Sequence, residues 1–183
     1  HNNQRSVSDG DGVYKSEDGG RTYRNVGLKT TEHIARIVID PRDSNVVYVA
    51  APGPLWKGGG ERGLYKTTDG GKTWSQSLIK VDDYTGCSDV VMDPNNPHVL
   101  FAGMWQFVIH TWGRVSGGPG SGLYKSIDGG ATWTRLAGHG LPDQEVGKVA
   151  VAIARTNSKR VYAMIETGTG EPGKGKPTAP GEL

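Results

Sequence analysis

The chain has 183 residues, with 21 basic and 19 acidic side chains and a formal net charge of +2. The charges are interspersed, without the basic stripe of a nucleic-acid-binding protein, and no apolar run approaches the length of a membrane span. The single cysteine, Cys87, excludes an internal disulfide framework and a cysteine-based zinc site, and the spacing of the five histidines predicts neither a metal site nor a cofactor.

The composition favours short strands joined by tight turns. The sequence contains 29 glycines and 10 prolines, which without a collagen-like period suit either disorder or many turns. Five Trp and seven Tyr residues favour the second interpretation, because disordered chains are poor in aromatic and β-branched residues.

Two kinds of segment alternate along the chain, and each predicts a pair of strands. The first kind reads GVYKSEDGGRTYRNVG at 12–27, GLYKTTDGGKTWSQSL at 63–78 and GLYKSIDGGATWTRLA at 122–137. The second kind reads HIARIVIDPRDSNVVYVAAPG at 33–53, GCSDVVMDPNNPHVLFAGMWQ at 86–106 and, in degenerate form, EVGKVAVAIARTNSKRVYAMIE at 145–166. Glycine-rich turns interrupt the first kind, and Asp-Pro turns at Asp40 and Asp93 interrupt two copies of the second.

The two kinds share a period of 50 to 60 residues that contains four strands. The repeated acid falls at Asp18, Asp69 and Asp128, in steps of 51 and 59 residues. Four short antiparallel strands per repeat form the blade of a β-propeller, and a sandwich built from hairpins is the alternative. The predicted fold is an all-β propeller, with about three blades and an incomplete ring in this chain. The predicted units are a half blade (1–28), two blades (29–80 and 81–138), and a half blade with the start of the next Asp-box strand (139–183).

The three glycine-rich turns match a known repeat. They read S/T-x-D-x-G-x-T-W, apart from Tyr23 in the Trp position, which resembles the Asp-box, or bacterial neuraminidase repeat. The surrounding sequence, including VDDYTGCSDVVMDPNNPHVLFAGMW and SGGPGSGLYKSIDGGATWTRL, resembles the sortilin/VPS10-type propellers of large bacterial proteins described as glycosyl-hydrolase-like. This resemblance covers almost the whole chain. It implies a fragment of a propeller of seven or more blades, and an extracellular, periplasmic or envelope-associated location.

The repeated acids have a structural interpretation. Asp18, Asp69 and Asp128 can each accept hydrogen bonds from the backbone N–H groups that follow, while Trp74 and Trp133 pack over their hairpins. The alternative is a calcium loop, but each box offers one carboxylate where Ca²⁺ takes about six to eight oxygen ligands. The sequence therefore predicts a structural turn in each box.

The long loops predict a binding face on the side of the blades opposite the boxes. They follow the second strand of each repeat, at 52–63, 105–122 and 167–182, and loops commonly carry binding residues on a rigid scaffold. Trp105 is expected in the core, because it directly follows a strand. The other aromatic and basic residues are expected to be exposed: Lys57, Phe107 and the candidate ligand- or partner-binding residues Trp56, Arg62, His110, Trp112 and Arg114.

Three functions remain open. The preferred interpretation is a non-catalytic scaffold that recognises a protein, peptide or glycan through these loops, because the sequence carries no recognisable catalytic motif. The first alternative is a glycoside hydrolase, sialidase- or xyloglucanase-like, which would use loop carboxylates such as Glu32, Asp82 or Asp83. The second is a structural subunit that completes a larger propeller with a neighbouring chain.

Overall fold

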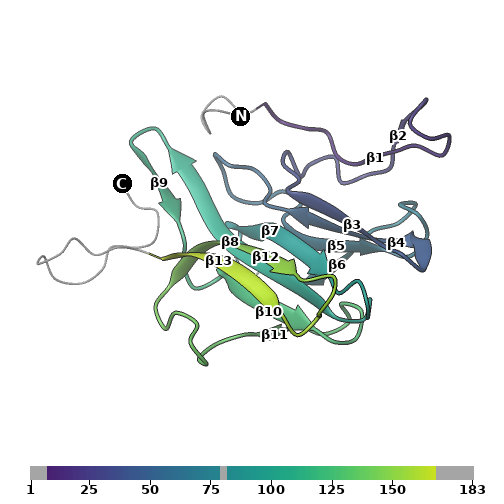
Figure 1. Cartoon of the computed structure of the whole chain (residues 1–183). Coiled ribbons are helices and arrows are strands. Elements are labelled where there is room, and N and C mark those ends of the chain that lie inside the picture. The colour runs from purple at the N-terminus through teal and green to yellow at the C-terminus, as the bar shows by residue number, and fades with distance from the viewer. Residues whose placement is uncertain (1–7, 79–81, 168–183) are drawn as a thin grey trace, which may run out of the picture.

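The computed structural model describes residues 8–78 and 82–167, and these residues form antiparallel β-structure (Figure 1). Within these two ranges no helix is long and apolar enough to cross a membrane. The strands of the described part are β1 (Tyr14–Lys15), β2 (Arg24–Asn25), β3 (Arg36–Asp40), β4 (Asp43–Ala51), β5 (Gly63–Thr67), β6 (Ser75–Leu78), β7 (Thr85–Met92), β8 (Leu100–His110), β9 (Gly113–Ser116), β10 (Gly122–Ser126), β11 (Thr134–Arg135), β12 (Val146–Ile153) and β13 (Val161–Thr167).

The strands form sheets in which neighbours in sequence are mostly neighbours in space. One sheet has the order β3-β4-β5-β6, and the next has the order β7-β8-β10-β11, with β9 paired to the C-terminal half of β8. The pairs β1-β2 and β12-β13 form two smaller sheets. Four antiparallel strands in sequence order are the arrangement of a propeller blade. The described residues thus confirm the predicted all-β blades in an open ring, while the further strand expected after residue 167 lies outside them.

The hydrophobic core lies between neighbouring sheets. Ala50 on β4 and Leu64 on β5 are fully buried and share one cluster with Val90 on β7 and Ala102 on β8. A second cluster joins β8 and β10 to β12. Burying a side chain of the size of Leu or Val contributes about 1.5–3 kcal/mol, so each sheet depends on its neighbour for much of its stability.

Glycines allow the sheets to approach closely. A Cβ atom added to Gly103 on β8 would lie 2.5 Å from the carbonyl oxygen of Val149 on β12. The same carbonyl accepts a hydrogen bond of 2.7 Å from the hydroxyl of Ser88 on β7. Gly86 faces the carbonyl of Pro52 in the same way. A larger residue at either glycine would push the neighbouring sheets apart.

Candidate functional site

Each Asp-box turn is built around one carboxylate. In the second box, Oδ1 of Asp69 accepts hydrogen bonds from the hydroxyl of Thr67 (2.7 Å) and from the N–H groups of Lys72 (3.0 Å) and Thr73 (2.9 Å). Oδ2 accepts a hydrogen bond of 2.6 Å from the hydroxyl of Thr73. The first and third boxes repeat the two hydroxyl contacts and the threonine N–H contact.

These hydrogen bonds keep the carboxylates ionised. The side chain and backbone of Thr22, together with the hydroxyl of Ser16, lower the pKa of Asp18 to about 2. Equivalent hydrogen bonds hold the pKa of Asp69 and of Asp128 well below the usual range of an aspartate. A carboxylate whose oxygens are occupied within its own turn is poorly placed to exchange protons with a substrate.

The boxes also connect neighbouring sheets. Nε1 of Trp74 donates a hydrogen bond of 2.7 Å to the carbonyl of Val26, beside β2, and Nε1 of Trp133 donates one of 3.2 Å to the hydroxyl of Ser77 on β6. The rings lie against the second glycine of their own boxes, but their N–H groups reach the sheet before. The second and third boxes are therefore both turns and joints between blades.

The opposite side of the sheets carries the loop face, which we define as residues 29–35, 52–62 and 82–84 together with the β8–β9 hairpin. Backbone hydrogen bonds join the hairpin to residues 52–62 and 82–84, and the N–H of Thr30 donates one of 2.8 Å to the carboxylate of Glu61. The N–H of Ile109 donates to the carbonyl of Leu55 at 2.7 Å, and the N–H of Phe107 donates to the carbonyl of Tyr84 at 3.1 Å. The loop face is thus one connected surface, although its segments come from different parts of the chain.

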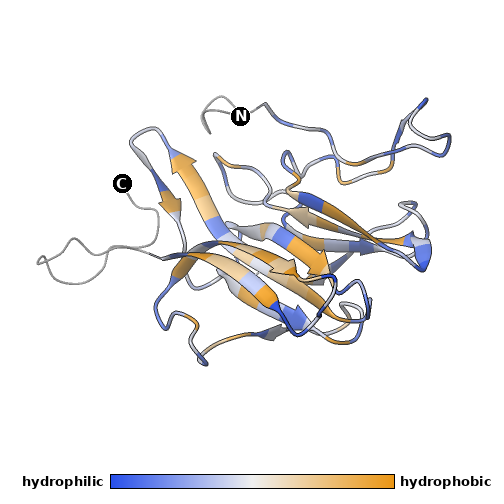
Figure 2. Cartoon of the chain, in the orientation of Figure 1, coloured by the Kyte–Doolittle hydropathy of each residue, from blue (hydrophilic) through white to orange (hydrophobic). Residues whose placement is uncertain are grey.

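The prediction of a long loop at 105–122 is wrong for the first half of this range. β8 continues to His110, and β9 returns beside it, so that a hairpin projects from the sheet (Figure 1). Alternate residues on the extension, Trp105, Phe107 and Ile109, are buried with Leu55 of the neighbouring loop. Figure 2 shows the end of β8 that runs into the hairpin as hydrophobic. The expectation that Phe107 is exposed is therefore wrong, while Trp105 lies in the core as expected.

Arg62 is not an exposed cation, and the expectation that it faces a ligand is wrong. Only 1% of the residue is exposed, although it was predicted to lie on the surface of its loop. Burial lowers the pKa of its guanidinium. Arg62 donates hydrogen bonds to five backbone carbonyls, those of Pro52, Pro54, Lys57, Gly59 and Tyr84. Its role in the structure is to fix the 52–62 loop and to tie it to the next sheet.

Three aromatic side chains of the loop face remain exposed. Trp112, at the tip of the hairpin, is 82% exposed and stacks on His110, with ring centroids 4.8 Å apart and ring planes within 1°. Trp56 is 44% exposed and Tyr84 is 42% exposed. The sequence predicted the exposure of Trp56 and Trp112, whereas His110, also predicted to be exposed, is half-buried. Tyr84 was not predicted, because it stands in an acidic loop without another aromatic residue nearby.

Arg114 lies on β9 and lines a groove at the base of the hairpin. Trp105, Lys148 and Glu166 line the same groove. Nε1 of Trp105 donates a hydrogen bond of 2.9 Å to the hydroxyl of Ser116, which donates one of 2.6 Å to the carboxylate of Glu166. The ammonium of Lys148 lies 5.3 Å from the centroid of the Trp105 ring. The groove therefore combines an aromatic wall with groups of both charges.

The predicted carboxylates of the loop face have structural contacts. Asp82 caps its loop, because Oδ1 accepts hydrogen bonds from the N–H groups of Tyr84 (2.6 Å) and Thr85 (2.7 Å). Glu32 forms an ion pair of 2.7 Å with Lys57. The backbone of Asp83 accepts a hydrogen bond of 2.8 Å from the N–H of Gly59. Asp82 is therefore assigned to loop structure.

A cluster of metal-ligand type also lies on this side of the molecule. Carboxylate oxygens of Asp9 and Glu32 and a ring nitrogen of His33 lie within 4.8 Å of one another. The sequence pattern does not indicate this cluster, because Asp9 is separated from the other two residues by more than twenty residues that include a complete Asp-box.

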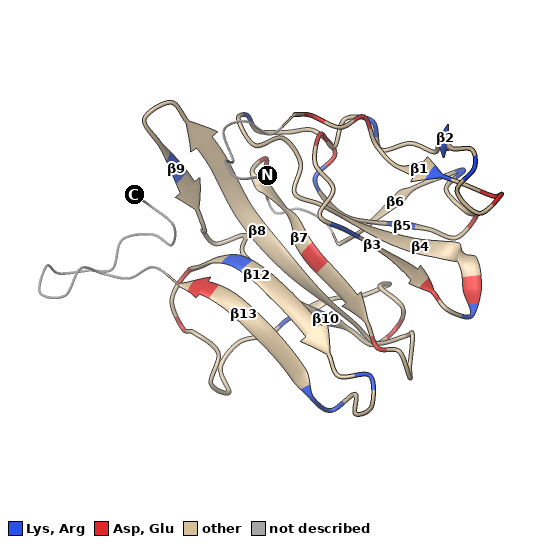
Figure 3. Ribbon diagram, turned by 45° about the horizontal axis from the view of Figure 1, so that its top comes forward, with Lys and Arg blue, Asp and Glu red and all other residues tan. Residues whose placement is uncertain are grey.

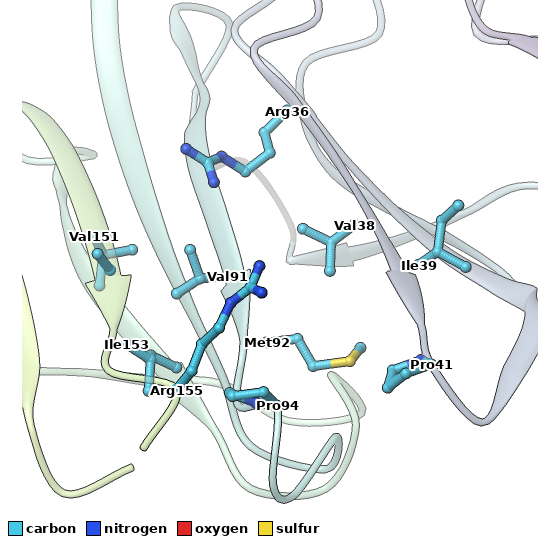
Figure 4. Close-up of a pocket in the computed structure, with 11 residues that line it drawn as sticks. Arg36, Val38, Ile39, Pro41, Val91, Met92, Pro94, Val151, Ile153 and Arg155 are labelled. Atoms are coloured by element: carbon cyan, nitrogen blue, oxygen red, sulfur yellow. The ribbon is translucent and has the colours of Figure 1, made fainter. Parts of the chain in front are cut away.

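A separate groove runs along the first strands of three successive sheets. Its wall includes Val38 on β3, Val91 and Met92 on β7, and the guanidinium groups of Arg36 and Arg155 (Figure 4). First strands line the central channel in a closed propeller. This groove therefore belongs to the channel side of the blades and is distinct from the loop face.

The part of the chain that contains the repeated blades matches the profile of a known protein family. The profile of the Sortilin-Vps10 family, described as "Sortilin, neurotensin receptor 3", matches residues 11–164, which include all three Asp-boxes. The chain belongs to the Sortilin-Vps10 family. The match confirms the predicted resemblance.

Curated relatives of this Sortilin-Vps10 chain include two xyloglucanases. One, from Paenibacillus sp, is 30% identical over 115 residues, covering 56% of this chain and 10% of the relative. The other, from Hypocrea jecorina (strain QM6a), is 25% identical over 183 residues, covering 86% of this chain and 20% of the relative. The chain thus spans about a tenth to a fifth of the length of these relatives.

Solved structures show the same fold. An ancestral GH74 enzyme superposes with a TM-score of 0.59 at 20% identity, covering 90% of this chain and 20% of its own. The GH74 enzyme of Niastella koreensis superposes with a TM-score of 0.60 at 23% identity, and the match covers 83% of this chain and 21% of that enzyme. The GH74 xyloglucanase of Xanthomonas campestris superposes with a TM-score of 0.58 at 17% identity, and the match covers 88% of this chain and 25% of that enzyme. At these identities the likeness establishes the architecture of the Sortilin-Vps10 chain.

Proposed function

We propose that this chain is part of a glycoside hydrolase that acts on xyloglucan or a related glucan, and that its loop face binds the polysaccharide. The named relatives favour the hydrolase over the non-catalytic scaffold that the sequence alone favoured. A hydrolase of an extended polysaccharide meets its substrate outside the cytoplasm, which supports an extracellular or envelope location.

The observation that carries the proposal is the exposed ring of Trp112 at the hairpin tip, stacked on His110. Trp112 presents an open ring face, and His110 holds its plane from the other side. Sugar rings have apolar C–H faces that pack on exposed aromatic rings, and clustered exposed aromatic side chains mark binding surfaces. Trp56 and Tyr84 extend the same surface along the neighbouring loops.

Asp82 and Glu32 are held by contacts within the protein, which favours a binding role over a catalytic role for this segment. A glycoside hydrolase uses two carboxyl groups on opposite sides of the scissile bond, about 5–9.5 Å apart. Asp82 accepts hydrogen bonds within its own loop, and Glu32 is paired with Lys57. The segment therefore contributes substrate contacts, and its aromatic rings are the groups to test first.

The test measures both binding and hydrolysis of xyloglucan. Affinity electrophoresis is expected to show retardation of the protein by xyloglucan, with binding by Trp112→Ala weakened about tenfold. Trp56→Ala is expected to weaken it to a smaller extent. The matched control is Tyr23→Ala, which removes a 63% exposed aromatic ring on the Asp-box side. Release of reducing ends from xyloglucan checks the activity. Binding that is unchanged in Trp112→Ala, or a protein that neither binds nor cleaves the polymer, would overturn the proposal.

A further inference from the structure

The two ring nitrogens of His33 differ, because one is hydrogen-bonded and the other is buried without a partner among the described residues. Its Nδ1 lies 3.2 Å from the carbonyl oxygen of Gly53. A carbonyl oxygen only accepts hydrogen bonds, so Nδ1 is the donor, which leaves Nε2 as the ring nitrogen that can bind a metal ion. Among the described residues, Nε2 of His33 is the buried side-chain nitrogen or oxygen without a hydrogen-bond partner. A histidine oriented by a carbonyl in this way has the arrangement of a metal ligand.

Two carboxylates accompany this histidine. Oxygens of Asp9 and Glu32 lie within 4.8 Å of each other and of a ring nitrogen of His33. Ligands of a tetrahedral Zn²⁺ site, with bonds of about 2.0–2.2 Å, lie about 3.3–3.6 Å apart. The three groups lie within 4.8 Å of one another, so side-chain shifts of about 1 Å bring them into range of one ion.

The backbone around Glu32 is held in a strained conformation. Glu32 has φ of +57°, which a residue with a side chain adopts at some cost. Its carbonyl accepts a hydrogen bond of 2.7 Å from the N–H of Gly10, which brings the segment of Asp9 against it. Backbone strain of this kind persists where the surrounding structure fixes the residue, and here it places the two acids together.

A positive charge already lies at the cluster. The ammonium of Lys57 lies 2.7 Å from Oε1 of Glu32, and its side chain is 68% exposed. The cluster therefore attracts cations, and the exposed lysine is free to swing away when a stronger one binds.

We propose that Asp9, Glu32 and His33 bind a divalent transition-metal ion, which displaces Lys57 from Glu32. One imidazole and two carboxylates form a mixed nitrogen and oxygen ligand set, which suits Zn²⁺ better than the all-oxygen set that Ca²⁺ prefers. The bound ion joins the N-terminal segment at Asp9 to the loop face. It lies next to the loop that carries Trp56, so metal binding orders one side of the aromatic surface.

The test is calorimetric titration of chelator-treated protein with Zn²⁺ alone. One ion per chain is expected at this site, and Asp9→Asn, Glu32→Gln and His33→Gln should each lower the affinity at least about tenfold. Lys57→Met removes the competing ammonium and should raise the affinity about fivefold. The matched control, His98→Gln, changes an exposed histidine on the Asp-box side and should leave the affinity unchanged.

Several outcomes overturn the proposal. They are equal Zn²⁺ affinity in wild type and in Glu32→Gln, no Zn²⁺ binding in either wild type or Lys57→Met, and tighter binding of Ca²⁺ than of Zn²⁺. If His33→Gln does not fold, Asp9→Asn decides, because it changes an exposed side chain. Binding seen only in Lys57→Met would also overturn the proposal, because the ammonium would then hold Glu32 against the ion.

Discussion

Nε of Arg36 and Oδ1 of Asp89 form an ion pair of 2.7 Å that joins β3 to β7. The second oxygen of Asp89 accepts a hydrogen bond of 2.8 Å from the N–H of Val151 on β12. Figure 3 shows the corresponding acidic segment in the middle of β7, between the other two strands. One buried carboxylate thus connects the first strands of three successive sheets.

Removal of this carboxylate is expected to destabilise the protein. Asp89→Ala leaves the N–H of Val151 without its acceptor in a buried position, and should lower the free energy of unfolding by about 2 kcal/mol. Arg36→Ala removes a half-exposed partner and should cost less than about 1 kcal/mol. Urea unfolding of both variants measures the difference. Equal losses would show that the ion pair, and not the hydrogen bond to β12, carries the effect.

Arg62 should be irreplaceable by lysine. Lysine has three donors on one nitrogen, and it cannot reach the five carbonyls that the guanidinium contacts. Arg62→Lys is expected to lower the free energy of unfolding by about 3 kcal/mol, whereas Arg24→Lys at an exposed site should change it by less than about 0.5 kcal/mol.

Hydrogen exchange distinguishes a local effect of Arg62→Lys from a global one. The amides of Phe107 and Ile109, which bond to the neighbouring loops, should gain more in exchange rate than the amide of Val90 in the core, whose gain reports the global loss of stability. A uniform increase at all three amides would contradict the assigned role of Arg62 as the anchor of the loop face.

The Asp-boxes should make stability depend on pH in the acid range. Their aspartates have folded pKa values below the unfolded value of about 3.9, with that of Asp18 at about 2. Such groups contribute stability that is fully present above the unfolded pKa and is lost as the pH falls toward the folded pKa. Thermal unfolding between pH 7 and pH 2 should therefore show a falling midpoint below about pH 4. In Asp69→Asn/Asp128→Asn the midpoint should be lower at pH 7 and the decline shallower, and a decline as steep as in wild type would contradict this origin.

Substitution of Gly103 is expected to destabilise the protein, because a side chain there would clash with β12. Gly103→Ala places a Cβ against the carbonyl of Val149 and should cost about 2 kcal/mol. The control is Gly19→Ala, at a position with φ of +72° and no neighbouring atom within 4 Å, where only backbone strain of about 1 kcal/mol applies. Chemical unfolding compares them, and a smaller loss at Gly103 would mean that β8 and β12 separate easily.

The blades were predictable because their signals are local. Each Asp-box specifies its own turn through residues at most four positions apart, so the pattern predicts the geometry wherever it occurs. The β8 extension was harder to recognise. Trp105, Phe107 and Ile109 alternate as in a strand, but the glycines that follow favoured a loop. The burial of these three side chains depends on Leu55, which lies in the loop between β4 and β5.

The charged residues of the loop face were the least predictable. The carbonyls that bind Arg62 lie up to 22 residues away, and carbonyl positions leave no signal in the sequence. Asp9 meets His33 only because the fold brings two segments together. Side chains whose roles depend on such distant backbone contacts cannot be assigned from the pattern of residue types.

The tryptophans of the second and third boxes have a consequence for how propellers gain blades during evolution. Trp74 and Trp133 each bind the sheet before their own, and the corresponding acids are separated by one repeat of 59 residues. A duplicated gene segment of that length would encode a blade together with the clasp that fastens it to its predecessor. Copying such a segment would add a blade that already carries its contact with the preceding blade. Propellers with different numbers of blades could then arise without a new interface between blades.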